Sequence, residues 1–320
     1  MRFGRDMLVL LCLAAVLCAA SRQGGAQSGD GNAASQSQDV RFAVKVELVS
    51  LYATVHDRRG RVVAGLSQGD LVVYDNDEPQ AISQFSREYV PLSVVILLDT
   101  SSSMAGRKLD HAKKSLVQFL KRLNPGDEAL LMTFNSRPIL LQGFTRDLDR
   151  IKRALGRLEG IGSTALYDAI LQGLQEARKA HNRRSVLLLV SDGINTYGSA
   201  ELNGTISQLR HSAAELFAIG IESDLPEEIQ YQAISRSVLE QLTGSAGGEA
   251  FIVVQPKELG AVCDRISERM HHQYALAYYP PQTREGQWRS VRIEARIPAL
   301  RVVASKTGYY ATAEHSRSKK

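Results

Sequence analysis

The spacing of apolar residues divides the chain into three stretches. From residue 41 to 90, apolar and polar positions alternate, as in VELVSLYATVHD, and turn-forming segments such as DRRG and DNDEPQ interrupt the alternation. This pattern is typical of strands with one buried face. We expect three or four antiparallel strands here, which are too few to bury a core of their own.

The stretch from residue 91 to 271 has a different rhythm. Short apolar runs without alternation, such as SVVILLD, EALLMTF and SVLLLVSD, are typical of strands buried on both faces. Between such runs lie segments with apolar residues at helical spacing, such as GRKLDHAKKSLVQFLKRL and PKELGAVCDRISERM. We therefore predict a doubly wound α/β domain with a mostly parallel, Rossmann-like sheet. The basic positions of the first of these helices are expected to face solvent.

Alternation returns from residue 272 to 312, in QYALAYYPP, RSVRIEARIP and RVVASKTGYYA. These segments predict three further half-buried strands. We expect them to complete an antiparallel β-sandwich with residues 41–90, so that the α/β domain is an insertion into the sandwich. Residues 313–320 are expected to form a solvated basic tail.

The first 26 residues have the three-part order of a secretory signal peptide. Arg2 and Arg5 precede an apolar run from Met7 to Ala20, and small residues follow, with cleavage expected after Ala26 or Ala20. An uncleaved N-terminal anchor is the alternative. Residues 27–40, rich in Gly, Ser and Gln, are predicted to be a flexible leader. The protein is therefore expected to be exported, to the periplasm, the cell envelope or the medium.

The composition and charge of the chain argue against a nucleic-acid partner and against an internal disulfide. Hydrophobic residues make up 44% of the chain and charged residues 23%, which is ordinary for a globular protein. The net charge of +5 falls to +3 when the signal peptide, with three arginines and one aspartate, is removed. We find no basic stripe interleaved with aromatics, so a nucleic-acid partner is not expected. Loss of Cys12 and Cys18 leaves only Cys263, so stability must come from a core rather than from an internal disulfide.

Oxygen-bearing side chains follow three of the predicted elements. Asp99, Ser101 and Ser103 come directly after one buried strand, Thr164 stands at the start of a helix, and Asp192 follows another strand. In an open α/β sheet, ligands bind beyond the carboxyl ends of the strands. Hard divalent cations such as Mg²⁺ prefer oxygen ligands, so three loops could converge on one metal ion. The alternative is that Asp99 and the serines cap the next helix without a metal.

This constellation resembles the von Willebrand factor type A (VWFA) domain. Asp99, Ser101, Ser103, Thr164 and Asp192 match, in chain order, the residues of that family's metal-ion-dependent adhesion site (MIDAS). The flanking strands are similar to those of exported bacterial proteins described as VWFA-related, known especially from acidobacteria. The resemblance implies binding of Mg²⁺, or Mn²⁺ or Ca²⁺, with a carboxylate of a protein partner as the last ligand.

Two functions are compatible with these features. The first is a non-enzymatic exported protein that binds an acidic side chain of a protein partner through the metal. The second is a structural or assembly subunit of a cell-envelope complex, in which the metal only stabilises the loops. An enzyme with a small-molecule substrate is not expected, because the chain has no P-loop lysine and no G-x-S-x-G elbow.

Overall fold

A computed structural model of the chain describes residues 48–87, 89–222, 229–281 and 286–311. The predicted signal peptide, the leader and the basic tail lie outside the described residues. Among the residues described, no helix has both the length and the apolar character needed to cross a membrane.

The central element is a six-stranded sheet with the strand order β10-β9-β8-β5-β6-β7. Only β7, at one edge, runs antiparallel to its neighbour. Every residue of β5 is buried, as the absence of alternation predicts. The strands are β5 (Leu92–Asp99), β6 (Glu128–Phe134), β7 (Pro138–Thr145), β8 (Arg184–Ser191), β9 (Glu215–Ile221) and β10 (Ala250–Val253).

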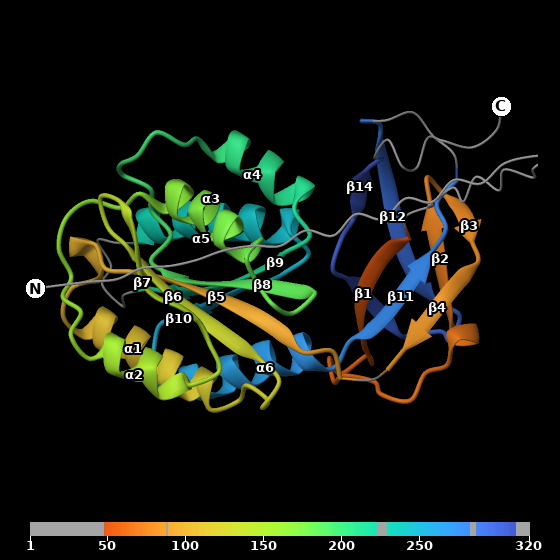
Figure 1. Ribbon diagram of the computed structural model, residues 1–320, viewed down its shortest axis with the longest axis horizontal. Helices are drawn as coiled ribbons and strands as arrows, with labels where there is room; N and C mark the ends of the chain where they lie inside the picture. The colour runs from red at the N-terminus through yellow and green to blue at the C-terminus, as the bar shows by residue number, and fades with distance from the viewer. Residues whose placement is uncertain (1–47, 88, 223–228, 282–285, 312–320) are drawn as a thin grey trace, which may run out of the picture. The chain divides into compact units, whose positions relative to one another are not determined.

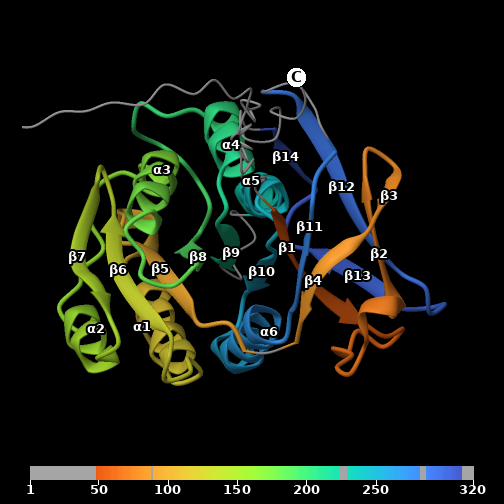
Figure 2. The ribbon, with the colours of Figure 1, turned by 45° about the vertical axis from the view of Figure 1, so that its right-hand side comes forward.

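Helices cover both faces of this sheet (Figures 1 and 2). Val94, Ile96 and Leu98 of β5 pack in one core with the first group of helices, whereas Val95 and Leu97 pack in another with the second group. Successive side chains of a strand point to opposite faces, so one apolar run serves both cores. The first group is α1 (Arg107–Leu120), α2 (Leu148–Leu155) and α6 (Leu259–His271); the second is α3 (Leu166–Ala177), α4 (Leu202–His211) and α5 (Ile229–Ser245). This doubly wound arrangement confirms the predicted fold class.

The flanking strands form two four-stranded antiparallel sheets, ordered β13-β1-β11-β4 and β14-β12-β2-β3. Each sheet contains strands from both ends of the chain, as the sandwich hypothesis requires (Figure 1). The N-terminal strands are β1 (Val49–His56), β2 (Leu71–Asp75), β3 (Glu78–Gln80) and β4 (Ile82–Ser86). The C-terminal strands are β11 (Tyr274–Tyr278), β12 (Trp288–Ala295), β13 (Arg301–Ala304) and β14 (Gly308–Tyr310).

The C-terminal region has four strands rather than the three expected. The segment predicted as one strand, RVVASKTGYYA, is divided into β13 and β14, which belong to different sheets. Ser305 lies between them and is tied to β1, because its N–H donates to the Tyr52 carbonyl (2.6 Å) and its hydroxyl accepts from the Tyr52 N–H (3.0 Å). The chain leaves the first sheet at this point and crosses to the second.

A buried carboxylate links the two sheets of the sandwich. Asp75, at the end of β2, is fully buried and accepts hydrogen bonds from the hydroxyls of Tyr278 and Tyr309, each at 2.8 Å. Its other oxygen accepts from Arg289 Nε at 2.6 Å. Burial and the hydrogen bond to Asp75 both raise the pKa of Tyr278. One ion pair with two tyrosine hydroxyls thus joins four strands.

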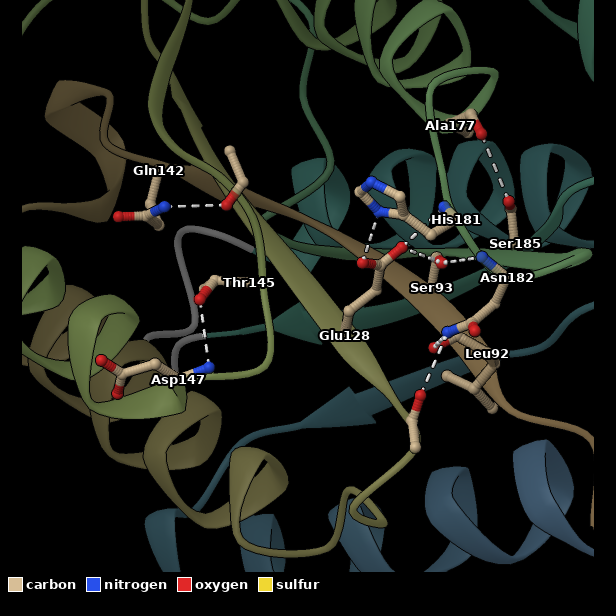
Figure 3. A network of polar contacts seen from close by, with 12 residues as sticks. Leu92, Ser93, Glu128, Gln142, Thr145, Asp147, Ala177, His181, Asn182 and Ser185 are labelled. Atoms are coloured by element: carbon tan, nitrogen blue, oxygen red, sulfur yellow. Dashed lines mark hydrogen bonds and ion pairs between the residues drawn. The ribbon is translucent and has the colours of Figure 1, made fainter.

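A second polar cluster lies at the amino ends of β5, β6 and β8 (Figure 3). Glu128 accepts from the Ser93 hydroxyl (2.6 Å) and from the His181 backbone N–H (2.8 Å), and its other oxygen lies 2.8 Å from His181 Nδ1. Although burial alone would raise it, these hydrogen bonds lower the pKa of Glu128. The Asn182 side chain donates to the Leu92 carbonyl at 2.9 Å. This cluster fixes the end of the sheet opposite the predicted metal site.

The junction between the two parts of the fold is also polar. Asp127, ahead of β6, accepts from the Leu92 N–H at 3.0 Å and from the Tyr89 hydroxyl, and lies 2.8 Å from His271 Nε2. His271 is the last residue of α6, so it holds the end of this helix against the start of β5. Cys263, in the same helix, is a buried free thiol, as expected for a structural cysteine.

Candidate metal site

The sheet topology brings two of the predicted metal ligands to one edge. β5 and β8 are parallel neighbours, and Leu98 lies opposite Val190. Asp99 therefore ends β5 next to the point where Asp192 follows β8. From β5 the chain continues to β6 on one side, whereas β8 lies on the other side. Open α/β sheets form a crevice at such a reversal of strand order.

The first loop holds its oxygen atoms close together. Asp99 is fully buried, and its carboxylate accepts from the Ser101 N–H (2.9 Å) and from the Ser191 hydroxyl (2.6 Å). The hydroxyl oxygens of Ser101 and Ser103 are 3.1 Å apart. Neither the short 3-10 helix at Ser102–Met104 nor α1, preceded by Gly106, has a side-chain cap. The capping alternative is therefore wrong for these serines.

The loop that carries Thr164 is joined to the other two loops. The Ile161 N–H donates to the Thr100 carbonyl (2.8 Å) of the first loop. The Thr164 N–H donates to the Thr196 hydroxyl (2.9 Å), and the Thr164 carbonyl accepts from the Thr196 N–H (2.9 Å) of the third loop. A side chain on Gly160 would meet the backbone of Ala105 at 2.6 Å, so glycine permits the close approach of the loops. All five predicted residues thus lie on three loops, of which the Thr164 loop is hydrogen-bonded to both of the others.

Asp192 contributes a carboxylate oxygen that no described hydrogen-bond donor reaches. It is 7% exposed, and among the described residues its Oδ1 atom is buried without a hydrogen-bond partner. The ammonium group of Lys108 lies 3.7 Å from Oδ2. Lys108, with a side chain that is 22% exposed, departs from the basic solvent face expected for this helix, because α1 begins at the same edge of the sheet and its first turn lies at the site.

The electrostatics of the site favour a cation. Burial raises the pKa of Asp99 to about 6, and the charge of Asp192 contributes, although the hydrogen bonds from Ser101 and Ser191 oppose the shift. Two carboxylates thus lie near each other with little access to water, an arrangement that a positive ion stabilises. Within the described ranges, no three His, Cys, Asp or Glu side chains form a metal-binding group. A metal here would need the hydroxyls as well, and the residues present fit a hard divalent cation.

Exposed apolar side chains surround the site. Ile161 is 61% exposed, Tyr197 57% and Tyr231 62%. Ile161 and Tyr197 belong to the bonded loops, and the Tyr197 N–H donates to the Thr164 carbonyl at 3.1 Å. Tyr231 lines a hollow of about 230 Å³ together with Ser103, Lys108 and Asp192. Large exposed apolar groups around a polar centre are typical of a protein-binding surface.

Comparison with known proteins places this domain in a family. The profile described as von Willebrand factor type A domain matches residues 94–195, which include all five predicted ligands. The chain contains a von Willebrand factor type A domain. The similarity of the flanking strands to exported bacterial VWFA-related proteins stays a prediction.

Relatives of the VWFA domain occur in proteins of different lengths. Inter-alpha-trypsin inhibitor heavy chain H1 of Sus scrofa is 29% identical over 153 residues, which are 44% of this chain and 16% of that protein. An uncharacterized protein of Synechocystis is 26% identical over 187 residues, 57% of this chain and 42% of that protein. The chain thus spans less than half the length of either curated relative.

A solved structure shares the fold beyond the VWFA domain. The von Willebrand factor type A protein from Catenulispora acidiphila superposes with a TM-score of 0.50 at 14% identity, covering 77% of this chain and 75% of that one. At this identity the similarity concerns the fold alone.

Proposed function

We propose that this protein is an exported, non-enzymatic VWFA protein that binds a protein partner through a divalent cation, Mg²⁺ or else Mn²⁺ or Ca²⁺. Asp99, Ser101, Ser103, Thr164 and Asp192 would hold the ion directly or through water. When bound, the cation supplies an electrophilic position that a carboxylate of the partner can coordinate. The proposed cation is supported by the buried Asp192 oxygen that has no hydrogen-bond partner among the described residues. The proposed partner is supported by the exposed apolar residues around the site.

The residues of the site have separable roles in this proposal. Asp99 and Asp192 offset the charge of the ion, and the hydroxyls complete its oxygen environment without further negative charge. Lys108 lies beside Asp192 and adds a positive charge to the surface that an acidic partner approaches. Attraction between opposite charges of this kind raises association rates.

One observation favours binding over the alternative of a purely structural metal in an envelope complex. The three loops are already joined by backbone hydrogen bonds, and Gly160 packs directly on Ala105. Their conformation therefore has support from the protein itself. A metal that served only to hold the loops together would add little to these contacts.

The proposal predicts that Tyr197→Ser lowers partner capture by at least about tenfold while leaving metal affinity unchanged, because tyrosines at the centre of an interface contribute strongly to binding. The measurement is capture from the native envelope fraction and culture medium by the immobilised chain, in Mg²⁺ and in chelator. Tyr279→Ser is the matched control, since Tyr279 is 58% exposed but lies in the β-sandwich part of the chain.

The outcome separates the two functions. Capture that is lost in chelator and in Tyr197→Ser, but kept in Tyr279→Ser, is the expected result. Capture that is the same in Mg²⁺ and chelator, together with a large fall in melting temperature on chelation, would instead support the structural alternative.

A further inference from the structure

A second polar hollow lies between the β-sandwich and the VWFA domain. Its volume is about 580 Å³, within the usual range of small-molecule sites. The sandwich contributes Arg58, in the turn after β1, and Arg301 of β13, whereas α6 contributes Arg265 and Arg269. Glu249, just ahead of β10, also lines it. Because Glu249 precedes a parallel strand, this cleft is at the opposite end of the sheet from the metal site.

The acidic residues of the cleft do not neutralise its four guanidinium groups. Asp57 pairs with Arg61 (2.7 Å), which is outside the lining, and accepts from the backbone of its own turn. Glu249 is shared between Arg265 (3.4 Å) and Arg269. Glu268, the remaining carboxylate, is exposed on α6.

The two sandwich arginines carry the unmatched charge. In the part of the chain that the structure describes, neither Arg58 nor Arg301 has an ion pair, and both are exposed at the cleft. Both belong to the sandwich wall, and the exposed Arg265 of α6 lines the opposite wall, so guanidinium groups from both walls line the same hollow. Such an arrangement concentrates positive potential.

Arg269 adds a buried positive charge to the wall. Its residue is 8% exposed, its guanidinium lies over the ring of Phe217 at 5.5 Å, and among the described residues its Nε atom has no hydrogen-bond acceptor. A buried donor without a partner is costly, and an anion nearby offsets that cost. The effect of these charges reaches His56, whose pKa is lowered by burial and by Arg269, Arg301 and Arg265, although Glu249 opposes the shift.

We propose that this cleft binds a small polyanion that carries two or more carboxylate or phosphate groups. The guanidinium fork matches both groups, since each offers two oxygens in a plane. A ligand with a single charged group would contact the arginines of only one wall, either those of the sandwich or those of α6. A polyanion can contact Arg58 or Arg301 on the sandwich and Arg265 on α6 together, so its binding would hold the last VWFA helix and the sandwich in one arrangement.

The test is calorimetric titration of the full chain with citrate and, separately, with pyrophosphate. Both probes chelate divalent ions, so the buffer is metal-free and its ionic strength is fixed. Saturable binding of at least one probe is expected, and Arg301→Gln and Arg58→Gln should each weaken it by about tenfold or more. Both residues are exposed, so neither substitution threatens folding. Arg153→Gln is the control, because Arg153 is an exposed arginine on α2, outside the cleft.

The two probes distinguish the sources of the ligand. Preference for citrate indicates a polycarboxylate, and preference for pyrophosphate indicates a phosphorylated compound. Absence of saturable binding of either probe would overturn the proposal. Equal weakening by Arg153→Gln and Arg301→Gln would overturn it as well, since that shows non-specific attraction of an adventitious ion only. Asp99→Asn should bind the probes as the wild type does, so this result is independent of the metal site.

Discussion

Asp99→Asn is expected to stabilise the metal-free protein at neutral pH and to remove its stabilisation by Mg²⁺. The wild-type carboxylate is buried near Asp192, and its pKa is raised from 3.8 to about 6, mainly by burial. Between these two values of pH, Asp99 is therefore protonated in the folded state and ionised in the unfolded state. The stability of the metal-free wild type should fall as the pH rises from about 4 to about 6, and stay low above that range. Asparagine carries no charge, so the variant should gain about 1–3 kcal/mol above pH 6.

Urea unfolding of chelator-treated protein at about pH 4 and about pH 7.5, with and without Mg²⁺, measures both effects. Asp110→Asn, an exposed aspartate of α1, is the control and should behave as the wild type. A variant that is less stable than the wild type at both pH values without metal, or that gains as much stability from Mg²⁺, would contradict this account of the buried carboxylates.

Asp75→Asn is expected to have the largest effect on folding, a loss of at least about 2 kcal/mol, because it leaves the buried guanidinium of Arg289 without its counter-charge. Asp75 is fully buried, and the Arg289 side chain is 10% exposed. The matched control is Asp77→Asn, two residues further along. The Asp77 side chain is 87% exposed and its contact with Arg292 is 3.4 Å, so its loss should cost less than about 0.5 kcal/mol.

The single tryptophan of the chain, Trp288, lies in β12 and reports unfolding of the sandwich by fluorescence. Equal urea midpoints for Asp75→Asn and Asp77→Asn would show that the buried pair does not stabilise the sandwich.

The periodicity of the sequence was sufficient for the fold class but not for every strand. Fully buried runs such as SVVILLD are typical of parallel strands, because helices cover both faces of such a sheet, and every residue of β5 is buried. The pattern of apolar residues in RVVASKTGYYA does not mark the point at which β13 ends and the chain crosses to β14. It depends on Ser305 bonding to Tyr52, and a contact between residues 253 positions apart is not visible in local alternation.

The candidate ligands of the metal site could be proposed from the sequence, but the lysine beside them could not. Asp99, Ser101 and Ser103 stand in one short motif after a strand, and topology places Asp192 beside them. Lys108 was missed because a lysine in an amphipathic helix usually faces solvent, and only the position of the first turn of α1 brings it to Asp192. The arginine cleft had no local signal at all, since Arg58, Arg265 and Arg301 meet only when both ends of the chain pair around the inserted domain.

Titration of chelator-treated protein with Mg²⁺ by calorimetry, comparing the wild type with Thr164→Ala, tests the central claim most directly. The Thr164 backbone makes the loop hydrogen bonds, so alanine removes the hydroxyl and keeps the loop. We expect one ion per chain in the wild type and about tenfold or more weaker binding in Thr164→Ala. Ser163→Ala, which alters an exposed neighbour, should bind as the wild type does. No binding by the wild type, or equal affinity in Thr164→Ala, would contradict a cation held by these three loops.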